Sequence, residues 1–168
     1  MSNDGSPLHV RRKIRLALFD MDSTLIDQEV IDELARSIGK SDAVSAITAR
    51  AMNGEIDFAT SLRERVVMLR GVRADVWEEL KRSVTIASGA RELILKLKGA
   101  GVVTGVISGG FMPMAEWLKE ELGLDYAFAN HVCFQIPLSS RLTHRVISST
   151  FALLLRLRPC WELQLTLV

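Results

Sequence analysis

The chain has 168 residues, 48% of them hydrophobic and 24% charged, and its formal net charge is +1. This length and composition are typical of one globular domain with room for a small insertion. The near-neutral balance speaks against nucleic-acid binding, and two cysteines are too few for a disulfide framework. No apolar run reaches the roughly 20 residues of a membrane helix, and the polar N-terminus lacks a signal peptide. We therefore expect a cytoplasmic protein that does not bind membranes.

The first predicted strand follows a leader, residues 1–13, that we expect to be disordered. Residues 14–19 form a short run that is apolar on both faces, which is typical of a central strand in a parallel sheet. Asp20 and Asp22 come directly after it. Open α/β sheets bind their ligands at this carboxyl end of the strands, so the two aspartates are candidate site residues.

A helical pattern replaces the strand pattern in residues 28–83, which we expect to form a small cap. The apolar spacing and the turn residues predict four helices, at about 30–38, 41–52, 58–70 and 74–83. Asp57 can cap the third of these helices. Because no strand pattern interrupts them, the four helices are predicted to be an insertion after the first strand.

The alternation of helix and strand resumes at residue 84. Helices fit 90–99 and 111–122, and strands fit 102–107 and 126–130. Residues 14–27 and 84–130 are therefore predicted to form one core. The fold class is α/β, with a Rossmann-like parallel sheet and a small helical cap inserted after the first strand.

The composition changes at residue 131. Residues 131–168 contain no glycine, lysine or aspartate, and Glu162 is their only acidic residue. We hypothesise that this segment is an unrelated tail, produced by a frameshift or truncation, so that the core is truncated at its C-terminal side. The outer edge of the first strand is then unpaired unless the tail covers it. We do not expect Glu162 to lie near Asp20.

The first motif is Asp20-Met-Asp22-Ser-Thr, and it has the groups that phosphoryl transfer requires. A carboxylate at a strand end can attack phosphorus and form an acyl-phosphate. Asp22 lies two residues further on, so in extended chain it points to the same side, where it can transfer protons. Two such acids also suit Mg²⁺, which prefers oxygen ligands. An ordinary turn after a strand is the alternative.

The second motif is Ile107-Ser-Gly-Gly-Phe111, at the end of a predicted strand and before a helix. The Ser108 hydroxyl and the Gly109 main-chain N–H can donate hydrogen bonds to a phosphate near a helix N-terminus. Alone, the segment is more typical of an ordinary strand-to-helix turn. Together with the two aspartates it indicates a phosphate site.

Arg65 falls on the apolar stripe of the third predicted helix, with Phe58 and Leu62, whereas Arg63 falls well outside it. Arginine is seldom buried without a partner, and its planar fork suits a carboxylate or a phosphate. The alternative is an arginine whose stem lies along the margin of the stripe while its charge reaches solvent.

These segments together resemble the phosphoserine phosphatases of the haloacid dehalogenase-like hydrolase superfamily, over residues 14–130. The resemblance lies in residues 16–26, 29–35, 47–52, 58–66, 107–111 and 122–130. It implies hydrolysis of O-phospho-L-serine to L-serine and phosphate, a step of L-serine biosynthesis, through an aspartyl-phosphate and with Mg²⁺ as the cofactor.

The resemblance also implies roles for single residues. Asp20 matches the nucleophile and Asp22 the general acid/base; the Asp20 carboxylate and the Asp22 main-chain carbonyl match two Mg²⁺ ligands. Ser108 and Gly109 match the phosphate-binding pair. The residues matching the cap contacts are Glu29 for the ammonium group, Arg65 for the carboxylate, and Met52 and Phe58 for the pocket wall.

The chain departs from the family after residue 130. The family has a lysine that neutralises the phosphoryl group and an acidic loop that supplies a third Mg²⁺ ligand, but here no lysine follows Lys119 and no aspartate follows Asp125. Loss of one preorganised charge typically costs ~10²–10³ in rate, so we expect this chain alone to be weak or inactive. The alternatives are a phosphotransferase of the same superfamily, which passes the phosphate to another alcohol, and a non-catalytic remnant.

Overall fold

The computed structural model describes residues 13–73 and 75–131, together with the backbone of 166–167. The predicted leader up to residue 12, most of the predicted tail and Glu162 lie outside these residues. The elements in chain order are β1 (Leu16–Phe19), α1 (Val30–Ser37), α2 (Ser41–Met52), α3 (Phe58–Met68), α4 (Val76–Ser83), α5 (Ala90–Gly99), β2 (Val103–Phe111), α6 (Met112–Leu122), β3 (Tyr126–Asn130) and β4 (Thr166–Leu167). Within the described ranges, none of the helices combines the length and apolar character of a membrane span.

The sheet has the order β3-β2-β1-β4, and all its pairs are parallel. β1 pairs with β2 in the register Leu16↔Val103 to Phe19↔Val106. The last three side chains of β1 are buried, so the strand is covered on both faces, as the continuous apolar run predicts. The α/β class with a parallel sheet is confirmed.

The second edge of β1 is occupied by the short strand β4. Ala17 pairs with Thr166 and Leu18 with Leu167. Of the two arrangements that the sequence left open for this edge, an unpaired strand or cover by the tail, the structure has the second at these two positions. Backbone pairing there removes part of an exposed template for aggregation.

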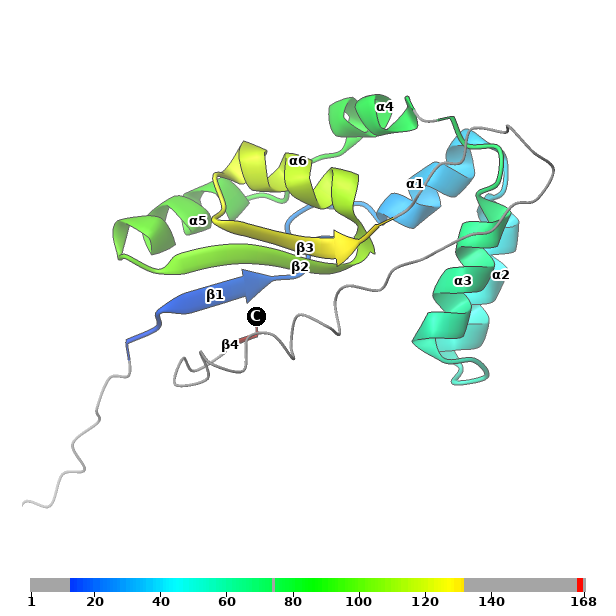
Figure 1. Cartoon of the computed structure of the whole chain (residues 1–168), viewed down its shortest axis with the longest axis horizontal. Coiled ribbons are helices and arrows are strands. Elements are labelled where there is room, and N and C mark those ends of the chain that lie inside the picture. Colours follow the sequence, from blue (N-terminus) through cyan, green and yellow to red (C-terminus); the bar gives the residue numbers. More distant parts are fainter. Residues whose placement is uncertain (1–12, 74, 132–165, 168) are drawn as a thin grey trace, which may run out of the picture.

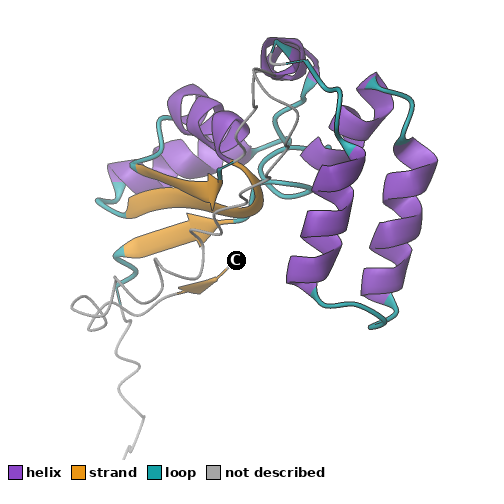
Figure 2. Ribbon diagram, turned by 45° about the vertical axis from the view of Figure 1, so that its right-hand side comes forward, coloured by secondary structure: helices purple, strands orange, loops and turns teal. Residues whose placement is uncertain are grey.

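Helices α5 and α6 lie along one face of the sheet, and α2 and α3 form an antiparallel pair that extends away from it (Figures 1 and 2). α4 packs between α1 and α6, where the Trp77 ring lies 5.8 Å from the ring of Phe111 at the end of β2. One continuous apolar cluster includes β1, α6 and side chains of the helical insertion such as Leu34 and Leu62. The insertion therefore shares the core of the sheet.

The helix bounds agree closely with the sequence pattern, and Asp57 caps α3 by accepting the Thr60 N–H at 2.7 Å. β2 is longer than the predicted strand 102–107, because it continues to Phe111. Its register with β3 shifts between Ile107 and Phe111, so the second motif forms an irregular strand end.

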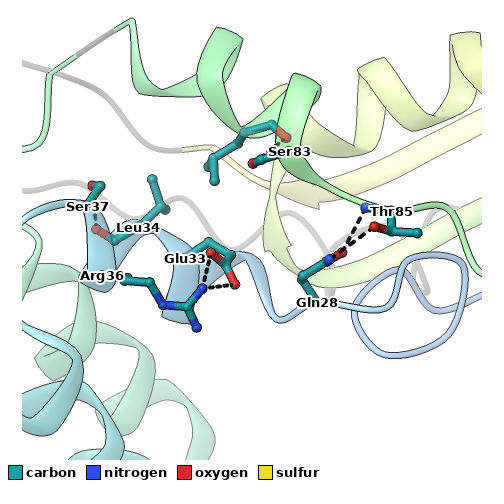
Figure 3. A network of polar contacts seen from close by, with 8 residues as sticks. Gln28, Glu33, Leu34, Arg36, Ser37, Ser83 and Thr85 are labelled. Carbon is teal, nitrogen blue, oxygen red and sulfur yellow. Dashed lines mark hydrogen bonds and ion pairs between the residues drawn. The ribbon is translucent and has the colours of Figure 1, made fainter.

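Two linkers, residues 20–29 and 84–89, join the sheet to the helical insertion and lie side by side. The Asp27 N–H donates to the Thr85 carbonyl at 3.0 Å. The Gln28 side chain uses both of its polar atoms on Thr85: Oε1 accepts the main-chain N–H at 2.9 Å, and Nε2 donates to Oγ1 at 3.4 Å (Figure 3). The two connections are therefore fixed to each other beside the sheet.

Candidate active site

A cavity of about 250 Å³ lies where the carboxyl ends of β1 and β2 meet helices α1 and α3. Six of the eight predicted site residues line it: Asp20, Asp22, Glu29, Phe58, Arg65 and Gly109. The remaining lining residues are Ile31, Leu62, Gly110 and Phe111. The cavity therefore brings together residues from the sheet and from the helical insertion.

Asp20 is the first residue after β1, at the carboxyl end of an internal strand. Its Oδ1 accepts the Met21 main-chain N–H at 2.7 Å. This contact fixes one carboxylate oxygen while the side chain still lines the cavity. A carboxylate held in this way can act as a nucleophile on a group bound in the cavity.

Asp22 is held at both of its oxygens. Oδ1 accepts the Val30 main-chain N–H at 3.0 Å, and Oδ2 accepts the Ser108 hydroxyl at 3.4 Å. Burial raises the pKa of Asp22 to about 6, and the charges of Glu29 and Asp20 act in the same direction, while the two hydrogen bonds oppose the rise. A carboxyl group that titrates near neutral pH is suited to proton transfer.

Ser108 is fully buried and does not line the cavity. Its Oγ accepts the Gly110 main-chain N–H at 2.8 Å and donates to Asp22. A Cβ at Gly110 would lie 2.9 Å from Asp22 Oδ2 and 3.1 Å from Ser108 Oγ, so this position has no room for a side chain. The sequence motif contained Gly110, but only its neighbour Gly109 was predicted as a site residue.

Phe58 at the start of α3 contacts Gly109 across the cavity. A Cβ at Gly109 would lie 2.9 Å from Cζ of the Phe58 ring, and the ring itself is 60% exposed. Met52, the other predicted wall residue, ends α2, is 84% exposed and does not line the cavity. The structure thus places one of the two predicted wall residues at the cavity.

Glu29 immediately precedes α1 and lines the cavity. Its Oε1 accepts the Ser23 hydroxyl at 2.7 Å. Ser23 has φ +51°, in the left-handed region that non-glycine residues rarely adopt. A strained backbone next to Asp22 therefore presents the hydroxyl that orients Glu29.

Arg65 lines the cavity and is half-buried, whereas Arg63 is exposed. Its Nε donates to the Ser61 carbonyl at 3.4 Å, and within the described ranges it forms no ion pair with a carboxylate. Burial lowers the pKa of the Arg65 guanidinium, and the carboxylates of Asp32 and Glu29 oppose this. The fork is thus available for an anion in the cavity.

The donors for a cation are incomplete. The Asp20 carboxylate is one oxygen ligand of the type Mg²⁺ prefers. Within residues 13–73 and 75–131, however, no three His, Cys, Asp or Glu side chains are grouped closely enough to hold a metal ion. The described site therefore fits Mg²⁺ only in part.

Comparison with known proteins places the chain in a family of hydrolases. A family model described as haloacid dehalogenase-like hydrolase matches residues 14–140, which extends past residue 130. The chain is 48% identical over 135 residues to a phosphoserine phosphatase of Archaeoglobus fulgidus, covering 80% of this chain and 38% of that protein. It is 45% identical over 123 residues to a phosphoserine phosphatase of Methanocaldococcus jannaschii, and this match covers 73% of this chain and 58% of that protein. The chain thus spans less than two thirds of these relatives.

Solved structures of phosphoserine phosphatases also superimpose on this chain. A substrate-bound phosphoserine phosphatase complex superimposes with a TM-score of 0.77 and 36% identity, covering 93% of this chain and 77% of the other. A phospho-aspartyl intermediate analogue of phosphoserine phosphatase gives a TM-score of 0.73 and 39% identity, covering 90% and 73%.

Proposed function

The chain belongs to the haloacid dehalogenase-like hydrolase family, and from that premise we propose that it carries the nucleophile, the proton-transfer carboxyl and the substrate cap of a phosphoserine phosphatase. The observation that carries the proposal is the shared cavity. Asp20 and Asp22 line it from the sheet side, and Glu29 and Arg65 line it from the helical insertion. One cavity thus combines the groups for phosphoryl transfer with the groups for an amino acid.

In the proposed first step an Asp20 oxygen attacks the phosphorus of O-phospho-L-serine. The bond from phosphorus to the serine oxygen breaks, and the Asp22 carboxyl gives its proton to that oxygen, so that serine leaves and an aspartyl-phosphate remains. In the second step the Asp22 carboxylate takes a proton from water, whose oxygen attacks the phosphorus. Phosphate leaves and Asp20 is restored.

The pKa of about 6 supports both roles of Asp22. At this value both protonation states are accessible near neutral pH, and the group is at once a competent acid and a competent base. Burial is the larger cause of the raised pKa, so substitutions that open the cavity to water are expected to lower it.

The substrate is recognised in this proposal by opposite charges on α3 and before α1. The Arg65 fork binds the carboxylate of phosphoserine, and Glu29, oriented by Ser23, binds its ammonium group. The apolar side chains of Phe58 and Leu62 line the cavity between these groups and can contact the substrate methylene. The predicted wall role of Met52 stays a prediction.

Mg²⁺ belongs to the proposal as the cofactor, and the Asp20 carboxylate and the Asp22 main-chain carbonyl are the groups that would hold it. When bound, it would neutralise negative charge on the phosphoryl group. We expect the partial fit of the donors in the described residues, together with the absence of lysine after Lys119 and of aspartate after Asp125 in this sequence, to limit turnover. At ~10²–10³ in rate for each preorganised charge, we expect the 168-residue chain to bind phosphoserine and to hydrolyse it slowly or not at all.

Binding affinities test this proposal, because they do not depend on turnover. We expect Arg65→Ala to raise the Kd for O-phospho-L-serine at least about 10-fold, the loss of one charged hydrogen-bonded contact, and Arg63→Ala, on the exposed side of the same helix, to leave it unchanged. O-phosphoethanolamine lacks the carboxylate, so its Kd should be insensitive to both variants. Equal effects of the two substitutions would contradict the proposed clamp, and no binding by the wild-type chain would contradict the substrate.

A further inference from the structure

Asn130, the last residue of β3, has an amide side chain at a position where burial of an apolar side chain would cost less free energy. The side chain is 1% exposed, and in the described part of the chain its Oδ1 has no hydrogen-bond partner. An unpaired buried acceptor typically costs about 1–3 kcal/mol. Its Nδ2 donates to the Gly109 carbonyl at 2.7 Å. This one hydrogen bond therefore has to account for the amide.

The contact is the first in a continuous series that ends at Asp22. The Gly109 carbonyl and the Gly110 N–H belong to the same peptide unit, so Asn130 holds one side of this unit. The other side donates from the Gly110 N–H to Ser108 Oγ at 2.8 Å. Ser108 then donates its own proton to Asp22 Oδ2 at 3.4 Å. The orientation of one peptide unit thus determines which way the Ser108 hydroxyl points.

The strand register explains why this peptide unit needs a side chain to hold it. Ile107 pairs with Phe128 and Phe111 pairs with Asn130, so three residues of β2 lie opposite one residue of β3. A regular ladder cannot serve the extra residues of such an irregularity. Asn130 lies at its far end and provides the donor from its side chain.

We propose that Asn130 is a positioning residue for Asp22: it fixes the peptide unit between Gly109 and Gly110 and so aims the Ser108 hydroxyl at the Asp22 carboxylate. The same constraint shapes the segment that contains Ser108 and Gly109, so Asn130 also supports phosphate binding there. This second effect rests on the proposed function, whereas the hydrogen-bond series does not.

Amide hydrogen exchange in the full chain tests the first effect without any ligand. Asn130→Leu keeps the branched outline and the number of heavy atoms of the side chain and removes both the donor and the unpaired acceptor. We expect the Gly110 amide to exchange at least about 10-fold faster, while other β2 amides keep their rates. Thr104→Val is the matched control: Thr104 is also fully buried in β2, but its Oγ1 donates to Asp125 at 3.1 Å, and neither of these residues lines the cavity. Unchanged exchange at Gly110, or a uniform increase along β2, would overturn the proposal.

Asn130→Asp tests the second effect through its pH dependence. The introduced carboxyl has the shape of the amide but donates to Gly109 only when protonated, and burial raises its pKa. The ratio of its Kd for inorganic phosphate to that of the wild-type chain should be near 1 at pH 5 and at least about 10 at pH 8. A ratio that does not vary with pH overturns the support for phosphate binding.

The two experiments separate this inference from the proposed function. If the wild-type chain binds neither phosphate nor phosphoserine, the proposed function fails, and the exchange of the Gly110 amide alone decides whether Asn130 positions Ser108. If Asn130→Leu does not fold, the same exchange measurement on Asn130→Asp at pH 5 and pH 8, corrected for intrinsic rates, gives the decision. Faster exchange of the Gly110 amide at pH 8 but not at pH 5 supports the proposal. Equal protection of this amide at the two pH values overturns it.

Discussion

The Asp22 carboxylate accepts the main-chain N–H of Val30 at 3.0 Å, which joins the predicted acid/base of the site to the first residue of the first helix of the insertion. A negative charge at a helix N-terminus is favourable, and this contact lowers the pKa of Asp22. Burial outweighs it and raises the pKa to about 6. The protonation state of Asp22 is therefore coupled to the stability of the fold.

The first prediction concerns stability and pH. The ordinary pKa of an aspartate, 3.8, is the value expected in the unfolded chain, and burial raises the pKa of Asp22 to about 6 in the folded one. Between pH 4 and 6 the unfolded state loses this proton first, so the contribution of Asp22 to the free energy of unfolding falls as pH rises. The Asp22→Asn variant has no titrating carboxyl at this position, so its free energy of unfolding does not show this decrease. Urea unfolding should show equal stability near pH 3.5, and at pH 7.5 an advantage of about 2 kcal/mol for the variant.

The control for this prediction is Asp27→Asn, an exposed carboxylate in the same linker. The difference between variant and wild type is the relevant quantity, because other carboxyl groups also titrate in this range. A pH-independent difference for Asp22→Asn, or the same profile for Asp27→Asn, would show that burial of Asp22 does not govern the effect.

The second prediction compares the two glycines after Ser108. The Cβ of an alanine at Gly110 would lie 2.9 Å from Asp22 Oδ2 and 3.1 Å from the buried Ser108 hydroxyl, and we expect a loss of about 1–3 kcal/mol from overpacking. Alanine at Gly109 would meet only the far end of the Phe58 ring, which is largely exposed and can move. Its cost should stay below about 0.5 kcal/mol. Chemical unfolding of both variants measures this order, and the reverse order would refute it.

The third prediction concerns the strain at Ser23. Ser23→Gly relieves the left-handed backbone but loses the hydrogen bond to Glu29, whereas Ser23→Ala loses the bond and keeps the strain. We expect the glycine variant to be more stable than the alanine variant by about 1 kcal/mol in urea unfolding. Both variants should bind O-phospho-L-serine more weakly, because Glu29 loses its orientation. Equal stabilities would mean that φ at this position is not strained.

The fourth prediction concerns the contact between the two linkers. Gln28→Ala removes the acceptor of the Thr85 N–H, so exchange of this amide should be faster by about 5-fold or more. Gln28→Glu keeps an acceptor oxygen and loses only the longer bond at 3.4 Å, so protection should remain. If both variants expose the Thr85 amide equally, the side chain of Gln28 does not hold the linkers together.

Much of the fold could be predicted from local pattern. The helix bounds follow from apolar stripes and from caps such as Asp57. The stripe of the third helix also favoured Arg65 over Arg63 as a candidate, and Arg65 lines the cavity. These features depend on neighbours within one or two turns, which a sequence displays directly.

The rest depends on contacts between distant segments. The extension of β2 through two glycines arises from an irregular register with β3, and the exposure of Met52 depends on how α2 sits beside the cavity. Asn130 is 108 residues from Asp22 along the chain, and nothing in its local sequence indicates the series of hydrogen bonds between them.

The most direct test of the central claim is phosphorylation of Asp20 itself. The 168-residue chain would be incubated with O-phospho-L-serine and Mg²⁺, quenched in acid to preserve an acyl-phosphate, and digested for mass spectrometry. The proposed function predicts one phosphoryl group on the peptide that contains Asp20, and none in the Asp20→Asn chain. No phosphoryl group on the wild-type peptide, or the same modification in the Asp20→Asn chain, would contradict it.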